Sequence, residues 1–114
     1  GRVRLAEASL GTTSLLAMGA GERDGFLRAA SRARLTRFGG DCYAYALVAS
    51  GYLDAVVEIG LQPYDYLPVV PVVEAAGGVM TDWSGAPLGL RSDGRVIAAA
   101  SPALHDELMR VVND

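Results

Sequence analysis

The sequence predicts an α/β fold in which helices cover a largely parallel sheet. Segments typical of strands and helices alternate along most of the 114 residues, as in successive βαβ units. Hydrophobic residues make up 51% of the chain and charged residues 20%, a composition that supports an ordinary core and excludes a disordered chain. The length leaves room for one domain, so residues 1–114 are expected to form a single unit.

The amino-terminal third predicts two strands around one helix. Residues 3–10 are expected to be extended and to be interrupted at Gly11-Thr12-Thr13, and residues 19–21 are expected to form a loop. Residues 22–32 indicate a helix, because acidic residues precede arginines in the order that suits the helix dipole. A short strand is expected over residues 34–38.

The middle of the chain predicts two helices around a buried strand. Asp41 suits the N-cap of a helix that runs to Ser50. Residues 53–59 are β-rich and mostly apolar, which indicates a strand covered on both faces. Asp65 is expected to cap a helix that reaches about residue 76, and Pro71 should kink this helix or delay its start.

The carboxy-terminal third predicts two strands and a final helix. The strands are expected over residues 79–82 and 95–100, and Ser101-Pro102 has the N-cap and N1 order that favours a helix start. The apolar positions that should face the core along this helix are Leu104, Leu108, Val111 and Val112.

Charge is unevenly distributed along the chain. All ten basic residues are arginine, so chemistry that requires a lysine is excluded. Residues 1–38 carry seven arginines and three acidic residues, whereas residues 39–114 carry three arginines and ten acidic residues. The acidic part would attract a divalent metal or a cationic ligand. A pI near 5.0 disfavours a nucleic-acid partner.

Compartment and topology are also constrained. One cysteine cannot form an internal disulfide, and no apolar run is long enough to span a membrane. With no leader evident, a cytoplasmic protein without a membrane partner is expected. Because the chain opens with Gly-Arg-Val-Arg and enters structure at once, we interpret it as a fragment that lacks its amino-terminal portion.

Three acidic residues are candidates for a binding site. Asp41 and Asp65 each begin a helix directly after a strand and a turn, and Glu58 stands near the end of the preceding strand. The carboxyl ends of strands form the crevice where open α/β sheets bind ligands. Three converging acids call for a metal or a cationic group to neutralise them. The alternative is that Asp41 and Asp65 only cap their helices.

Other residues that could carry chemistry have simpler interpretations. His105 stands between Leu104 and two acidic residues of the last helix and is expected to be a solvated surface residue. Cys42 follows a helix cap, but a small packed residue is the favoured interpretation. Trp83 follows a strand end and is expected to pack rather than to stack on a ligand.

Taken together, these motifs resemble the inositol monophosphatase-like family. Tyr64-Asp65 followed by Glu74-Ala75-Ala76-Gly77-Gly78 is similar to its carboxy-terminal signature. The turn Gly40-Asp41-Cys42, the Gly-x-x-Asp of residues 51–54 and Glu58 stand at the family's spacing. Residues 39–45 resemble the histidinol-phosphatase branch most closely. The fold implied is the carboxy-terminal α/β subdomain of a layered sandwich.

The resemblance also implies roles for single residues. Asp65 would be a ligand of Mg²⁺, Glu58 would contact the leaving-group part of a small phosphorylated alcohol, and Gly40, Asp41 and Cys42 would line the same pocket. Asp41 replaces a threonine that is common in inositol-type members. A carboxylate there suits a substrate with an ammonium or imidazolium group, such as histidinol phosphate.

The rest of the family's catalytic apparatus is absent from this chain. The Glu-Glu pair, the Asp-Pro-x-Asp-Gly-Thr loop and the residues that activate water do not occur, so no catalytic residue is assigned here. The chain is therefore expected to need the missing amino-terminal half of a Mg²⁺-dependent phosphomonoesterase, in which metals stabilise the attacking and leaving oxygens. Inositol-1-monophosphatase is the alternative activity, and a non-catalytic binding or scaffold domain is the alternative class. The oligomeric state stays open, a homodimer included.

Overall fold

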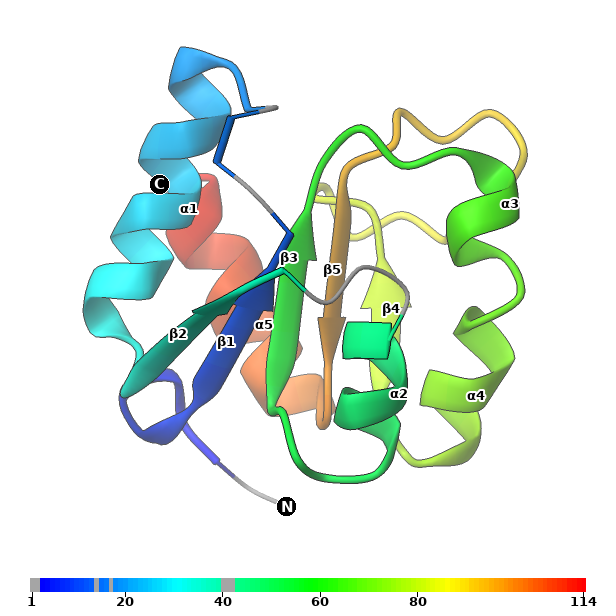
Figure 1. Ribbon diagram of the computed structural model, residues 1–114, viewed down its shortest axis with the longest axis horizontal. Coiled ribbons are helices and arrows are strands. Elements are labelled where there is room, and N and C mark those ends of the chain that lie inside the picture. Colours follow the sequence, from blue (N-terminus) through cyan, green and yellow to red (C-terminus); the bar gives the residue numbers. More distant parts are fainter. Residues whose placement is uncertain (1–2, 14, 17, 40–42) are drawn as a thin grey trace.

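The protein is built on one five-stranded sheet with helices against both faces (Figure 1). A computed structural model describes residues 3–13, 15–16, 18–39 and 43–114. The strand order is β2-β1-β3-β5-β4. The strands are β1 (Ser9–Thr12), β2 (Leu35–Phe38), β3 (Ala55–Glu58), β4 (Val79–Thr81) and β5 (Val96–Ala99). The α/β class predicted from the sequence is confirmed.

One strand of the sheet, β5, runs opposite to both of its neighbours. β1 pairs in parallel with both β2 and β3, whereas β5 is antiparallel to β3 and to β4. β3 lies at the centre and all four of its residues are buried, which confirms the prediction of a strand covered on both faces. β2 is an edge strand and is mostly exposed. Four strands therefore run in one direction and β5 opposes them.

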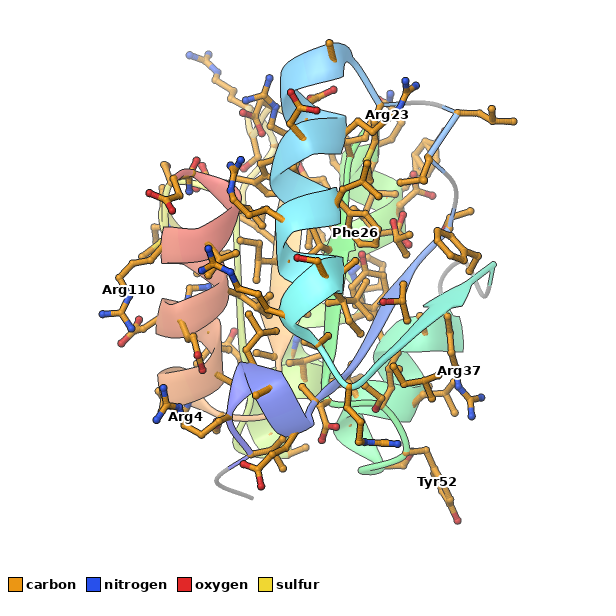
Figure 2. All side chains as sticks on the ribbon, turned by 90° about the vertical axis from the view of Figure 1, so that its left-hand side faces the viewer. Arg4, Arg23, Phe26, Arg37, Tyr52 and Arg110 are labelled. Atoms are coloured by element: carbon orange, nitrogen blue, oxygen red, sulfur yellow. The ribbon has the colours of Figure 1, made fainter. Side chains whose placement is uncertain are left out.

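Two helical layers enclose the sheet (Figure 1). On one face, α1 (Ala20–Arg32) and α5 (Pro102–Val112) share a core with inward side chains of β3 and β5. On the other face lie α2 (Tyr43–Ala49), α3 (Pro63–Tyr66) and α4 (Val70–Ala75), with a second core. Figure 2 shows α1 in front of the first core, with Arg37, Tyr52 and Arg110 pointing away from it.

The first segment differs from its prediction. A 3-10 turn covers Leu5–Glu7, and β1 begins only at Ser9. Gly11 lies inside β1 rather than interrupting it. A Cβ there would come within 2.8 Å of Leu53 Cδ2. Glycine in this strand marks the close approach of a neighbouring side chain rather than a strand end.

The predicted loop at residues 19–21 is also wrong. The α1 helix begins at Ala20, and the backbone N–H of Gly19 donates to Glu22 Oε1 at 2.8 Å. A glutamate at the third helical position that accepts from the cap residue is one half of a capping box. The acidic first turn that the sequence showed therefore belongs to a helix that starts two residues earlier than predicted.

The long helix predicted from Asp65 is two short helices. Pro63 takes the first position of α3, where a missing N–H costs nothing, so the helix starts before Asp65. Leu67 keeps helical dihedral angles at the end of α3, but Pro68 after it has no N–H to continue the helical hydrogen bonds. The α4 helix starts afresh at Val70 with Pro71 in its first turn, as the delayed start predicted for Pro71 requires.

The last helix confirms its predicted start and buried face. Ser101 Oγ accepts from the N–H of Leu104 at 3.3 Å, and the four predicted apolar residues are buried. His105, however, is 4% exposed, so its assignment to the surface was wrong. Its Nε2 lies 2.6 Å from Thr81 Oγ1 of β4. His105 shares a helix face with Leu108 and Val112, three and seven residues on, and is buried with them.

No helix among the described residues combines the length and the apolar character needed to cross a membrane.

Candidate functional site

The carboxyl edge of the parallel strands gathers the site residues that the structure describes. Because β1 and β3 are parallel, Thr13 after β1 and Glu58 at the end of β3 reach the same edge. From this edge the chain passes over the top of the sheet to α3, which carries Asp65 (Figure 1). This is the edge of the sheet at which α/β folds commonly bind ligands.

Glu58 is a buried carboxylate held by a hydroxyl. Glu58 is 4% exposed, and Thr13 Oγ1 donates to its Oε1 at 2.7 Å. A buried carboxylate without such partners would be strongly unfavourable. Thr13 is itself fixed, since its carbonyl accepts from the N–H of Gly39 at 3.0 Å. The ends of β1, β2 and β3 are thus tied together around one acidic group.

The backbone of Glu58 is held from the opposite side by Trp83. The indole Nε1 donates to the carbonyls of Glu58 and Val96, at 3.2 Å and 3.3 Å. These residues face each other across the β3–β5 ladder, so the indole closes that end of it. Trp83 is 5% exposed, which confirms that it packs within the fold.

Asp65 is placed by the connection from β3 to α3. The N–H of Leu61 donates to the carbonyl of Gly94 at 3.1 Å, which ties this connection to the segment before β5. Asp65 is the third residue of α3 rather than its N-cap, and its Oδ2 accepts from the N–H of Gln62 at 2.8 Å. Tyr66 is buried and donates its hydroxyl to the carbonyl of Gly89 at 2.6 Å, which anchors the short helix.

The donor set at this edge fits one ligand of a divalent cation but not a whole metal site. Asp65 is partly exposed, and no described residue donates to its second carboxylate oxygen. Within the part of the chain that the structure describes, no three His, Cys, Asp or Glu side chains come together as a metal site would require. Mg²⁺ is commonly bound through one or two carboxylates with other oxygen ligands. Asp65 could supply one of them.

Part of the predicted pocket lies outside the described residues. Gly40, Asp41 and Cys42 fall between β2 and α2 and are not among the residues that the structure describes. The predicted convergence of Asp41 with Glu58 and Asp65 is therefore not tested. Among the described acids, Asp54 lies at the opposite end of β3 from Glu58 and takes no part in this edge.

Asp82 lies just beyond the end of β4 and serves its own turn. Its Oδ1 accepts from the N–H groups of Ser84 and Ala86, both at 2.9 Å, and from Ser84 Oγ at 2.7 Å. Burial works to raise the pKa of Asp82, but these hydrogen bonds outweigh it and hold the pKa below its usual value. The carboxylate is committed to the turn.

Thr13 is the contact that sequence reasoning missed. The expected break at residues 11–13 placed it in a turn with no function. A usable signal was present: a hydroxyl residue directly follows one strand, and a buried acid ends a neighbouring parallel strand. Parallel pairing brings such strand ends to one edge, so the two side chains come within reach of each other.

Comparisons with known proteins fit this geometry. A model of the inositol monophosphatase family matches residues 6–114. The chain is 46% identical over 82 residues to the bifunctional phosphatase IMPL2 of Arabidopsis thaliana, which covers 72% of the chain and 24% of that protein. It is 37% identical over 93 residues to a histidinol-phosphatase of Streptomyces coelicolor, covering 82% and 34%.

The fold is shared with solved structures. An inositol monophosphatase from Zymomonas mobilis superposes with a TM-score of 0.95 at 39% identity, covering 98% of this chain and 44% of that one. The chain therefore spans less than half the length of each of these three proteins.

Proposed function

The chain belongs to the inositol monophosphatase family, and we propose that it is the carboxy-terminal part of a Mg²⁺-dependent phosphomonoesterase that hydrolyses histidinol phosphate to histidinol and phosphate. The proposal includes an amino-terminal half that supplies the remaining metal ligands and the groups that activate water. In support, the chain spans 44% of the Zymomonas mobilis structure, so more than half of that fold is contributed by other residues.

Asp65 is the residue of this chain that would hold the metal. It is partly exposed at the edge of α3, its Oδ2 is oriented by Gln62, and the geometry suits one carboxylate ligand. When bound, Mg²⁺ would supply Lewis-acid stabilisation of charge on the phosphoryl oxygens. The fold around Asp65, from the Leu61–Gly94 contact to the Tyr66 hydroxyl, would keep its carboxylate in a fixed position.

The observation that carries the substrate proposal is the buried carboxylate of Glu58 at the carboxyl edge. A buried acid at a strand-end crevice favours a ligand that brings positive charge or hydroxyl donors to it. Asp41 would add a second acid on the alcohol side. Two acids favour an ammonium or imidazolium alcohol over a neutral polyol, and the 37% identity to a histidinol-phosphatase supports the same choice.

Inositol 1-phosphate is the second candidate substrate. The likeness to the inositol monophosphatase of Zymomonas mobilis, at 39% identity, favours it. A neutral polyol would use Glu58 as a hydrogen-bond acceptor only, and Asp41 would then serve as a helix cap.

The test is an assay of both substrates with the intact parent protein in Mg²⁺, as wild type and as Asp41→Thr. A charge-assisted contact is typically worth about 1.5–3 kcal/mol, or roughly ten- to a hundred-fold in affinity. Wild type should prefer histidinol phosphate by about this factor. Asp41→Thr should narrow the preference, mainly through loss on histidinol phosphate.

Three outcomes would count against the proposal. A preference for inositol phosphate would reverse the order of the two substrates. An unchanged ratio in Asp41→Thr would remove Asp41 from the pocket, because threonine also caps helices. Absence of any phosphatase activity in the intact protein would favour a non-catalytic domain that keeps the fold.

A further inference from the structure

Two hydroxyl-to-carboxylate hydrogen bonds join β1 to β3, one at each end of the strand pair. Ser9 Oγ donates to Asp54 Oδ2 at 3.0 Å, and Thr13 Oγ1 donates to Glu58 Oε1 at 2.7 Å. In both pairs the donor and the acceptor are 45 positions apart in the sequence. The two contacts share their chemistry and their strands, so what distinguishes them is their place on the sheet.

The Ser9–Asp54 contact is accompanied by further hydrogen bonds that involve the backbones of the same two residues. Asp54 Oδ2 also accepts from the N–H of Ser9 at 2.8 Å, and the N–H of Asp54 donates to the carbonyl of Ser9 at 3.1 Å. Both side chains thus join the two strands at the end of the pair opposite Thr13 and Glu58. This contact stabilises the strand pair.

The Thr13–Glu58 contact holds a side chain instead. The backbone of Thr13 is fixed by Gly39 and that of Glu58 by Trp83, so both side chains hang from rigid strand ends. A glutamate has three rotatable side-chain bonds, and a directed hydrogen bond to its carboxylate restricts their rotation.

We propose that Thr13 is a positioning residue, whose hydroxyl fixes the side-chain conformation of Glu58 and so presents its carboxylate to the alcohol part of the substrate. The inference rests on the proposed function, in which Glu58 contacts the leaving group. A group that binds the alcohol equally in the ground and transition states affects KM rather than kcat.

The kinetic test uses the intact parent protein with Thr13→Val, Thr13→Ser and Ser9→Ala. Thr13→Val keeps the shape of the side chain and removes the hydroxyl, and KM for the preferred substrate should rise about ten-fold while kcat stays within about two-fold. Thr13→Ser restores the hydroxyl and should restore KM. Ser9→Ala removes the matched contact and should lower the thermal midpoint without changing KM.

Solution NMR of residues 1–114 tests the same idea without any reaction. The couplings and NOEs of the Glu58 side chain should report one rotamer in wild type and in Ser9→Ala, and averaged rotamers in Thr13→Val. If Thr13→Val does not fold, Thr13→Ala takes its place. A single unchanged rotamer in the variant lacking the hydroxyl overturns the proposal.

The two arms separate this inference from the proposed function. If the wild-type parent hydrolyses neither substrate, the proposed function fails and the rotamer measurement decides the role of Thr13 alone. If wild type is active but KM is unchanged in Thr13→Val, or rises equally in Ser9→Ala, Thr13 has only a structural role and the inference is overturned.

Discussion

The two ends of the β1–β3 pair differ in what their acidic residues can do. At the amino-terminal end, Asp54 is enclosed by Ser9 and contributes to strand pairing. At the carboxyl end, Glu58 is buried yet held by a side chain, and Asp65 beyond it keeps an oxygen to which no described residue donates. One pair of strands thus has an edge whose acid joins the strands and an edge whose acids are the candidates for ligand binding.

The difference follows from the geometry of parallel strands. Each strand must be continued by a connection that crosses the sheet, so the carboxyl edge gathers turns and helix starts whose polar groups the ladder does not use. Glu58, the connection at Leu61 and the first turn of α3 all stand there. Changes at this edge should alter function more than stability, and changes at the other edge the reverse.

The largest effect is expected at Asp65 in the intact protein. Asp65→Asn keeps the size of the side chain and can still accept from Gln62, but it loses the charge. If Asp65 holds the metal, turnover should fall by orders of magnitude, on the order of a thousand-fold, while stability falls by at most about 1 kcal/mol. Steady-state assays at several Mg²⁺ concentrations, with urea unfolding beside them, give both quantities.

Asp54→Asn is the matched control at the opposite edge. It should lower the free energy of unfolding by about 1–3 kcal/mol, because a charged acceptor of several hydrogen bonds is lost. Its turnover should stay near wild type. Equal losses of activity in the two variants would break the distinction between the edges, and wild-type turnover of Asp65→Asn at saturating Mg²⁺ would remove Asp65 from the metal site.

The second prediction concerns the helical face behind the sheet. In α1, a Cβ on Gly25 would clash with the carbonyl oxygen of Val112, so α1 and α5 would have to separate. Arg28 would be displaced as well, since its Nε donates to the carbonyl of Val111 at 2.8 Å. Gly25→Ala should therefore lower the free energy of unfolding by about 1–3 kcal/mol, measured by urea denaturation.

Gly21→Ala provides the control within the same helix. Nothing lies within 4 Å of a Cβ at Gly21, and alanine is the better helix former by about 0.5–1 kcal/mol. This variant should be as stable as wild type or more stable. If both substitutions had the same effect, helix propensity rather than the close contact with α5 would be the explanation.

Much of the fold could be predicted because local signals agree with the sheet. The apolar run before Glu58 indicated a buried central strand, and Ser101-Pro102 indicated the start of α5. The errors arose where tertiary contacts decide. Gly11 suggested a break, but Leu53 occupies the space that a side chain would need. Asp65 suggested a cap, but Pro63 moved the helix start ahead of it.

The candidate site was predictable to a similar degree. Glu58 and Asp65 follow from strand ends and helix starts together with the family motif. Glu58 is the last residue of β3, and Asp65 lies in α3, which follows it in the chain. Thr13 and the indole of Trp83 contact Glu58 from segments far away in the sequence. The Thr13 contact could be inferred only by combining two strand ends, and no pattern near Trp83 indicates its contact with Glu58. His105 was misplaced because its charged neighbours Asp106 and Glu107 hid its position on the buried stripe.

The third prediction concerns His105, which is buried on α5 against β4 and lies away from the candidate site. Burial lowers the pKa of this imidazole below its ordinary value of 6.5, and Asp106, whose Oδ1 lies 3.8 Å from Nδ1, opposes the shift only in part. Thr81 Oγ1 is its other close polar neighbour. The imidazole binds a proton more tightly in the unfolded chain than in the folded protein. The contribution of neutral His105 to the free energy of unfolding is therefore complete above about pH 6.5, and it decreases as the pH falls towards the lowered pKa.

Urea unfolding between pH 8 and pH 5 tests this prediction. His105→Gln loses the buried imidazole, so its free energy of unfolding should be lower than that of wild type at pH 8. Because glutamine cannot gain a proton, this variant should lack the decline below pH 6.5. The pKa of Glu107 is also lowered, mainly by the N–H of Leu5 and to a lesser degree by Arg4. Its titration affects stability only below its usual pKa of 4.5, outside the pH range of this experiment. A wild-type decline that persists in His105→Gln would assign it to other groups.

The smallest effect is expected when residues 1–114 meet Mg²⁺ alone. A ligand that binds only the folded state stabilises it by RT ln(1 + [L]/Kd), which is about 0.4 kcal/mol when the concentration equals Kd. One carboxylate is a weak site for Mg²⁺, which loses its bound water reluctantly. The described residues contain no group of three or more His, Cys, Asp or Glu side chains that could hold a metal ion. At 10 mM Mg²⁺ the thermal midpoint should therefore rise by no more than about 2 °C, and Asp65→Asn should abolish even that rise.

A larger shift that survives Asp65→Asn would mean that the chain binds Mg²⁺ elsewhere. A larger shift that Asp65→Asn removes would mean that the carboxyl edge is already a complete metal site, and the need for ligands from an amino-terminal half would fall with it.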